Sequence, residues 1–467
     1  MLFSSITFLF YFLPVTLLLY YLLPSRYRNI LLLVASLIFY AWGEPVYIIL
    51  MLLSIAFNYV GGLDIAQKSG DRRLARRSLA LSLAVNLALL GVFKYFTFFT
   101  DTLSRVLPFD LPSVELPLPI GISFYTFQAI SYLIDVYRGN AEVQKNPIHF
   151  ALYISMFPQL IAGPIVRYSE IENQLQRRKL SLEQFGYGAR LFIIGLAKKV
   201  ILANGIDALF SEISAEVTAG QAAVGTAWLG AAAYMLQIYF DFSGYSDMAI
   251  GLGHMFGFQF RKNFNHPYIA RSITDFWRRW HISLSSWFRE YLYIPLGGNR
   301  VSVPRHIFNL LVVWFLTGFW HGAAWNFIFW GLYYGILLIL EKYIWGRWLE
   351  KLPVPLQHLY SLLIILIGWV FFFSDTMAGA WQYLGVMFGA GAASGTWATL
   401  LYDLKSNWLL LLAGVICATD LPVRLQNMHG HSAGRIPLTV VLEMALFLLT
   451  ISCLVTETYN PFLYFRF

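Results

Sequence analysis

The chain has 467 residues, of which 58% are hydrophobic and only 12% are charged. Soluble domains carry about 25% charged residues, so this composition excludes an ordinary soluble protein and indicates an integral membrane protein. The formal net charge is +8, but no basic tract resembles a nucleic-acid reader, and excess Lys and Arg usually marks cytoplasmic loops. We therefore predict a protein surrounded by lipid bilayer, with no nucleic-acid partner.

Hydropathy predicts an all-α polytopic membrane protein. Apolar runs able to cross roughly 30 Å of hydrocarbon give about 11–12 transmembrane helices, and we treat residues 1–467 as one integral membrane domain. The expected spans are 3–23, 29–42, 46–63, 79–100, 119–137, 185–207, 224–253, 306–320, 324–343, 357–374, 406–419 and 437–456.

The charges of the connecting loops predict the orientation. Basic residues follow the first and third spans and recur at 176–179, whereas the loop 101–119 has one Arg against three acidic residues. The basic loops are expected in the cytoplasm and the loop 101–119 outside. The alternation then places the N-terminus outside.

Two segments do not fit simple crossing helices. The apolar segment 149–170 has cytoplasmic-type charges on both sides, and Pro158, Gly163 and Pro164 should break a helix there. Broken backbone at membrane depth requires surrounding protein or a water-filled cavity, so we expect a re-entrant segment beside a polar tunnel.

The segment Phe260–Pro304 holds seven basic and two acidic residues. It is expected to form an amphipathic or re-entrant helix at the cytoplasmic interface.

Polar residues within the membrane are costly and mark either a site or a helix contact. In "YFDFSGYSDMAIGLG" (239–253), Asp241, Ser243, Tyr245, Ser246 and Asp247 interrupt an apolar span. They are candidates for a substrate tunnel, and the alternative is hydrogen bonding between packed helices.

Two histidines are the candidate catalytic residues. In a continuous helix, Trp277, His281, Leu284 and Phe288 form one stripe, so His281 should point with apolar side chains, as a core residue or a catalyst. His321 lies near a turn between two apolar segments, beside glycines that we expect to leave room for a substrate. Burial disfavours the charged imidazolium, so a neutral ring is available as a general base.

Other chemistries lack local support. No Cys or carboxylate lies at metal-ligand spacing from either histidine, and both cysteines, Cys417 and Cys453, lie within apolar spans, so no metal site is expected. Neither a GxSxG elbow nor a P-loop is present. The remaining chemistry is base catalysis within the membrane.

At these residues the sequence resembles the membrane-bound O-acyltransferase (MBOAT) family. The motifs are "FPQLIAGPIVRY" (157–168), the 239–253 segment, "RWHISLS" (279–285) and "GFWHGAAWNFIFWG" (318–331). The resemblance covers about 118–345 as a catalytic core; in the C-terminal helices, 351–467, only the hydropathy and the closing "NPFLYFRF" support it. The most similar branch acetylates bacterial exopolysaccharides such as alginate.

The resemblance implies a tunnel that admits an acyl thioester, expected to be acetyl-CoA, from the cytoplasm, without a tightly bound cofactor. It implies that His321 is the essential histidine and His281 the second. It also implies a multi-pass location in a bacterial inner membrane, a polysaccharide acceptor and a periplasmic or extracellular relay protein. Further tunnel candidates are Asn265, Trp280, Trp320 and Asn326, and candidates for binding donor phosphates are Arg278, Arg279 and Arg289.

Two alternatives remain open at this point. A D-alanyl transferase acting on teichoic acid would share the fold and the histidines. A transporter or flippase for a polysaccharide precursor would need neither histidine as a base, although no internal repeat typical of many transporters is visible.

Overall fold

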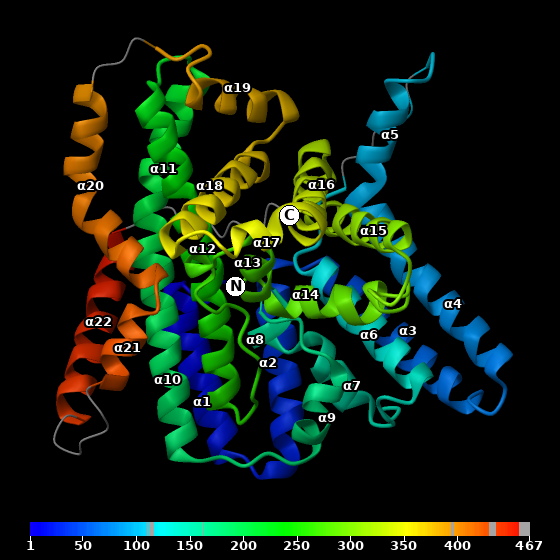
Figure 1. Cartoon of the computed structure of the whole chain (residues 1–467). Coiled ribbons are helices and arrows are strands. Elements are labelled where there is room, and N and C mark those ends of the chain that lie inside the picture. Colours follow the sequence, from blue (N-terminus) through cyan, green and yellow to red (C-terminus); the bar gives the residue numbers. More distant parts are fainter. Residues whose placement is uncertain (110, 112–115, 162, 394–396, 429–435, 457–467) are drawn as a thin grey trace. The chain divides into compact units, whose positions relative to one another are not determined.

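Helices form all of the regular structure that the computed structural model describes, namely within residues 1–109, 111, 116–161, 163–393, 397–428 and 436–456. This confirms the all-α prediction. In chain order (Figure 1), the elements are η1 Phe8–Phe12, α1 Leu13–Leu22, η2 Ser25–Tyr27, α2 Arg28–Gly43, α3 Tyr47–Gln67, α4 Arg72–Leu90, η3 Gly91–Tyr95, α5 Phe96–Ser104, α6 Ile122–Arg138, α7 Pro147–Ser155, α8 Phe157–Leu160, α9 Tyr168–Gln176, α10 Leu182–Ala197, η4 Lys198–Ala203, α11 Asn204–Thr218, α12 Val224–Met255, η5 Pro267–Ile269, α13 Ile273–Arg279, α14 Ile282–Phe288, η6 Arg289–Tyr293, α15 Val303–His321, α16 Trp325–Leu340, η7 Glu341–Trp345, α17 Gly346–Leu349, α18 Val354–Phe373, α19 Met377–Met387, α20 Trp397–Ala418, α21 Leu421–Met428 and α22 Ile436–Thr456.

Within the described residues, six helical stretches are long and apolar enough to cross a membrane, which agrees with a multi-pass protein. A shorter apolar helix occupies Phe8–Leu22. The full number of crossings stays a prediction. The six stretches are Tyr47–Gln67, Arg72–Ser104, Trp325–Leu349, Val354–Phe373, Trp397–Ala418 and Thr439–Thr456.

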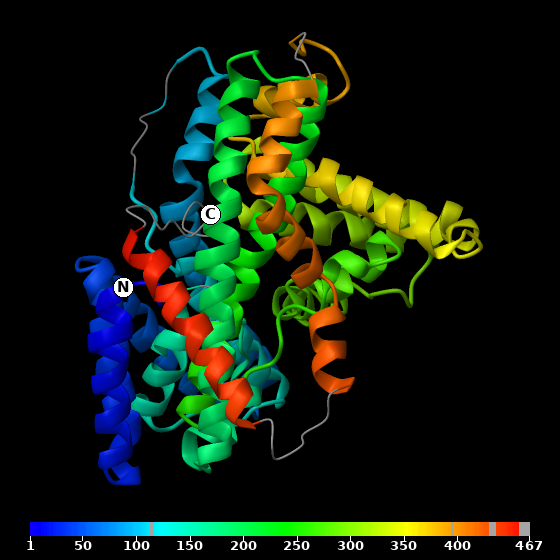
Figure 2. The same ribbon diagram turned by 90° about the vertical axis from the view of Figure 1, so that its left-hand side faces the viewer.

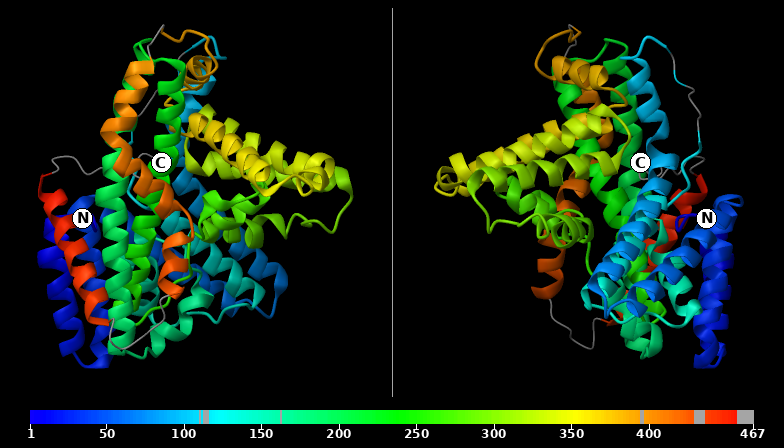
Figure 3. Two further views of the ribbon diagram at one scale, coloured as in Figure 1. Left: turned by 60° about the vertical axis from the view of Figure 1, so that its left-hand side comes forward. Right: turned by 90° about the vertical axis from the view of Figure 1, so that its right-hand side faces the viewer.

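The helices group into two compact units. Unit 1 comprises residues 1–192 and 245–261, and unit 2 comprises 193–244 and 262–467. In unit 1, α3, α4 and α6 pack against one another, and α2 packs against α7. In unit 2, α20 runs beside α11 (Figure 2). Helix α16 packs against both α15 and α18 (Figure 3). Both candidate histidines belong to unit 2.

The predicted break in the apolar segment 149–170 is present in unit 1. Helix α7 ends at Ser155, α8 covers only Phe157–Leu160, and irregular chain leads to α9 at Tyr168. Pro158 lies in the first turn of α8, where a missing backbone N–H does no harm. The described residues of the segment are almost entirely buried, which satisfies the requirement that broken backbone be surrounded by protein.

The basic segment of unit 2 is not one helix, so the prediction of a continuous helix was wrong. Helix α13 ends at Arg279, Trp280 is extended, and His281 adopts the left-handed conformation at φ 44° and ψ 54° before α14 begins. The hydrogen bonds at this break go to another loop. The Ile282 N–H donates to Asn263 O over 2.9 Å, and Arg279 O accepts from the Asn265 N–H over 2.9 Å.

Helices α15 and α16 form a closely packed hairpin, and His321 is the last residue of α15. A side chain at Gly318 would collide with the backbone oxygen of Phe327, and one at Gly331 with the backbone oxygen of Trp314. Only glycine at these positions lets the two backbones approach so closely. The hairpin therefore fixes the position of His321 by backbone contact.

Candidate active site

His321 is buried at the C-terminal end of α15, with 3% of its surface exposed. Its ring meets three aromatic rings edge-to-face, with centroid distances of 5.1 Å to Trp320, 5.0 Å to Trp330 and 5.4 Å to Phe372. This packing restricts the imidazole to one orientation, as a positioned catalytic group requires.

His281 is buried at the joint between α13 and α14, with 1% of its surface exposed. Its ring lies edge-to-face against Phe242 at 4.7 Å and reaches the Trp320 ring at 6.3 Å. On one edge, Nδ1 lies 3.2 Å from Asn263 Oδ1. Burial lowers the pKa of His281 to about 3, because an imidazolium loses its hydration there. His281 is therefore neutral near pH 7.

The two histidines line one cavity of about 320 Å³. Four positions on its wall, Trp277, His281, Leu284 and Phe288, are those of the predicted stripe, so they do share a face although the helix is broken. The cavity combines two buried imidazoles with a mainly apolar wall, which suits proton transfer to and from a small uncharged group. The remaining lining residues are Thr274, Arg278, Ser285, Arg289, Tyr293, Leu310, Val313, Trp314, Thr317 and Leu338.

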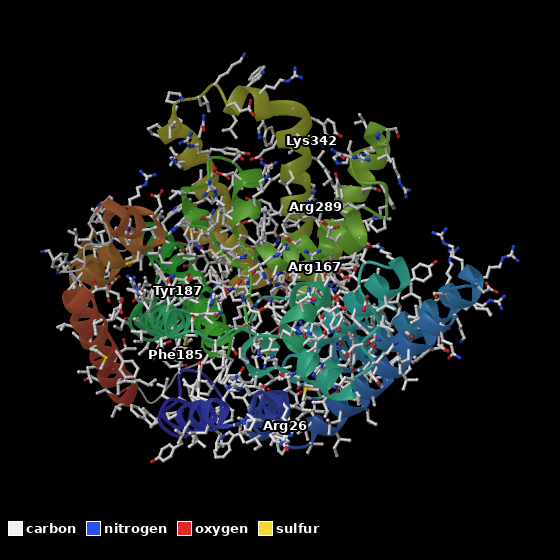
Figure 4. All side chains as sticks on the ribbon, turned by 90° about the horizontal axis from the view of Figure 1, so that it is seen from below. Arg26, Arg167, Phe185, Tyr187, Arg289 and Lys342 are labelled. Atoms are coloured by element: carbon white, nitrogen blue, oxygen red, sulfur yellow. The ribbon has the colours of Figure 1, made fainter. Side chains whose placement is uncertain are left out.

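A second, more polar cavity of about 630 Å³ adjoins the first, because Thr274, Arg278, Tyr293, Leu310 and Leu338 line both. Four basic side chains line it, Arg271, Arg278, Lys342 and Arg347, together with three acidic ones, Asp275, Glu341 and Glu350. Figure 4 labels Lys342 and also Arg289, which lines the first cavity. An anionic molecule could enter here and extend an uncharged end toward the histidines.

The three candidate phosphate-binding arginines have different surroundings. Arg278 and Arg289 are exposed and line the cavities. Arg279 lines neither; it forms an ion pair with Asp275 over 2.8 Å and donates to Asn265 O over 3.3 Å. Arg279 thus has a structural role at the end of α13.

Asp241 is held by a buried ion pair that sequence analysis missed. Its carboxylate lies 2.6 Å from Lys199 Nζ, with side chains 2% and 5% exposed. Lys199 lies in η4, a π-helical turn, and Gly244 on α12 packs against the backbone of Gly195 and Lys199. The polar residues at this place join α12 to the α10–η4 segment, as the helix-contact alternative expected.

The other tunnel candidates lie away from the cavity lining. Trp280 packs on Trp369 at 4.9 Å, and Trp320 packs beside both histidines without lining the cavity. Asn326 ties α16 to the end of α18 by donating to Phe371 O and Ser374 O, whereas Asn265 is exposed. Two further candidates, Tyr245 and Asp247, belong to unit 1, and Ser243 is buried on α12 of unit 2.

The glycines beside His321 do not make room for a substrate, contrary to expectation. Side chains at Gly318 and Gly322 would both collide with Phe327, on the backbone and the ring respectively. These glycines serve the packing of α15 against α16. The space next to His321 is instead the cavity of about 320 Å³ that His321 and His281 both line.

Three polar groups around the cavity went unnoticed in the sequence. Asn263 binds His281, as described above. Glu341, at the end of α16, accepts hydrogen bonds from the N–H groups of Ile273 and Thr274 at the start of α13. The Tyr293 hydroxyl lies 2.7 Å from His306 Nε2. Each contact joins residues distant in sequence, and only the polarity of these residues beside apolar spans signals them.

Comparison with known proteins identifies relatives along the whole chain. The model of the MBOAT, membrane-bound O-acyltransferase, family matches residues 144–374. A protein of Azotobacter vinelandii named probable alginate O-acetylase is 41% identical, and the alignment covers 100% of both chains. The peptidoglycan O-acetyltransferase of Helicobacter pylori is 39% identical over 84% of this chain and 81% of its own. The teichoic acid D-alanyltransferase of Bacillus subtilis is 30% identical over 58% and 72%.

Proposed function

The chain belongs to the membrane-bound O-acyltransferase family and is an acyltransferase, and from that premise we propose that it moves acetyl from a cytoplasmic thioester to hydroxyls of a polysaccharide outside the membrane. The observation that carries the proposal is the cavity of about 320 Å³ that both His281 and His321 line. Two buried imidazoles that line one cavity, with a more polar second cavity adjoining it, meet the needs of acyl transfer without a metal.

In the proposed reaction, His321 is the general base. It takes the proton of the acceptor hydroxyl while that oxygen attacks the thioester carbonyl. The tetrahedral intermediate collapses, the carbon–sulfur bond breaks, and the thiolate leaves with the proton returned by His321. His281 or nearby hydrogen-bond donors stabilise the oxyanion, and such donors are worth about 3 kcal/mol each.

We propose the second, more polar cavity as the entrance for the donor. Arg271, Arg278, Lys342 and Arg347 would hold the phosphates of acetyl-CoA, or of another phosphate-bearing thioester, while the acyl end reaches the histidines. Because these side chains are exposed, binding should be reversible and salt-dependent, as for a substrate rather than a resident cofactor.

The acceptor is inferred from relatives. The relatives named for acetylation of alginate and of peptidoglycan are 41% and 39% identical, whereas the D-alanyltransferase of Bacillus subtilis is 30% identical and covers only 58% of this chain. This favours acetyl over D-alanyl and an alginate-like polymer over teichoic acid. A separate extracytoplasmic protein would relay the acetyl group to the polymer.

We further propose a bacterial inner membrane as the location, with the N-terminus outside. In the loop 101–119, Pro112 lies outside the described residues, whereas Pro108 is described and exposed. In a variant with Cys417 and Cys453 replaced, a cysteine at Pro108 should react with an impermeant maleimide on intact spheroplasts, and a cysteine at Arg73 should react only after lysis. The reverse pattern would overturn the orientation.

Acetyl transfer from radiolabelled acetyl-CoA to the polysaccharide, in membranes containing the protein, tests the catalytic assignment. The His321→Ala variant should lose all transfer while remaining inserted. His281→Asn should lose most of it, and His266→Asn is the matched control, because His266 is the other described histidine in the left-handed conformation, at φ 45°. Asn tolerates that backbone better than Ala. Full transfer by His321→Ala would refute the assignment, and polymer export that fails without loss of acetylation would favour a transporter.

A further inference from the structure

Asn263 makes four hydrogen-bond contacts to the short segment that contains His281. Its Oδ1 lies 3.2 Å from His281 Nδ1, 3.1 Å from the Ser283 backbone nitrogen and 2.9 Å from Ser283 Oγ, and its backbone oxygen accepts from the Ile282 N–H. His281 itself provides no side-chain cap for α14. A residue 18 positions earlier in the chain therefore holds the first turn of α14.

These contacts determine which nitrogen of His281 carries the proton. A backbone N–H can only donate, so the Asn263 atom that faces the Ser283 nitrogen must be the amide oxygen and not the amide nitrogen. The same oxygen faces His281 Nδ1, and an oxygen can only accept there. The proton of the neutral ring must therefore lie on Nδ1, which leaves Nε2 as the acceptor nitrogen.

We infer that Asn263 is a positioning residue that holds His281 in the Nδ1–H tautomer, with Nε2 as a hydrogen-bond acceptor and not as the donor to the oxyanion. This inference rests on the proposed function and refines it. The proposed mechanism allowed either His281 or nearby hydrogen-bond donors to stabilise the oxyanion. With its Nε2 unprotonated, neutral His281 cannot donate to the oxyanion, so the other donors in the cavity must do so. It also makes His281 a second possible proton acceptor beside His321.

The surroundings of the contact support a role beyond capping. His281 is 1% exposed and Asn263 is 1% exposed, so water does not compete for Nδ1. Asn263 does not line the cavity among its described lining residues, so it acts on the reaction through His281 and the first turn of α14, not by touching a substrate. Loss of such an orienting partner lets the ring rotate and take the other tautomer.

Steady-state acetyl transfer by Asn263 variants, over a range of pH, tests the inference. Asn263→Ala removes the acceptor oxygen, and kcat should fall on the order of 100-fold, the contribution of one acid–base group. The KM for acetyl-CoA should stay near its wild-type value. Asn86→Ala, which removes another buried asparagine, in unit 1, is the matched control and should keep wild-type kcat.

Asn263→Asp gives the readout that a purely structural role would not change. The carboxylate keeps the oxygen acceptor and the cap, so transfer should persist. Its negative charge favours imidazolium and should raise the pKa of His281 by about 1–3 units. Because protonation of His281 stops the reaction, the acidic limb of the kcat profile should move to higher pH.

The outcomes separate this inference from the proposed function. If the wild-type protein transfers no acetyl, the proposed function fails. If the wild type is active and Asn263→Ala keeps wild-type kcat, the inference fails alone. If Asn263→Ala does not fold, the pH profile of Asn263→Asp decides, and an unmoved acidic limb would overturn the inference.

Discussion

Replacing Glu341 with Gln should loosen α13 and slow acyl transfer. The buried carboxylate accepts four hydrogen bonds: from the Ile273 N–H over 2.6 Å, the Thr274 N–H over 2.9 Å, the Thr274 hydroxyl over 2.7 Å and the Tyr360 hydroxyl over 3.2 Å. Glutamine has one amide oxygen and one amide nitrogen. In either orientation, the amide nitrogen faces one of the two backbone N–H groups, and both of these groups can only donate.

The expected loss follows from these contacts. A buried N–H left without an acceptor costs about 1–3 kcal/mol, and the missing charge at the N-terminus of α13 costs about 0.3–1 kcal/mol more. The free energy of unfolding should therefore fall by roughly 1–4 kcal/mol. Because α13 contributes Trp277 and Arg278 to the cavity wall, the transfer rate should fall as well.

Thermal unfolding in detergent and acetyl transfer would be measured on the same preparations. The exposed Glu212 on α11 supplies the control, since Glu212→Gln removes the same charge without buried contacts. Glu341→Gln should unfold several degrees earlier than that control. Equal unfolding temperatures and equal rates for the two variants would refute the reasoning.

Two further predictions concern packing and charge. Gly318→Ala should lower the free energy of unfolding by about 1–3 kcal/mol, because the new methyl meets backbone of Phe327 that cannot rotate away. Gly186→Ala, with open space around the new methyl, is the control in thermal unfolding. Equal stability of the two variants would contradict the packing argument. Lys199→Met should cost about 3–5 kcal/mol by leaving Asp241 charged and buried, and the double variant with Asp241→Leu should recover much of that stability. Failure of the second change to restore stability would show that the pair is not an isolated unit.

The sequence was sufficient to predict the all-α membrane fold, and local signals singled out two histidines that line one cavity. His321 stands at the turn of an apolar hairpin, and the stripe from Trp277 to Phe288 was correctly placed on one side of the chain. The same spacing concealed the break at His281, because periodicity cannot show that the neighbouring backbone groups bond to Asn263 and Asn265.

Long-range partners account for most of the other errors. Asp241 looked like a tunnel residue because its partner, Lys199, lies 42 positions earlier, in η4. Gly318 and Gly322 looked like space for a substrate because the chain segment that fills that space, at Phe327, cannot be located without the hairpin geometry. In each case the residue type indicated an unusual position in the fold, but the sequence alone did not show which residue it contacts.

The joint at His281 also has a consequence for how the enzyme matures. Helices α13 and α14 have seven residues each, too few to be stable in isolation. They can be ordered only after the loop at Asn263 and the carboxylate of Glu341 have docked onto them. Catalytic competence would thus arise late in assembly, so a newly inserted chain cannot consume thioester before its tertiary structure is complete. Mild detergents that loosen this docking should abolish acyl transfer while the helix content of the protein is unchanged.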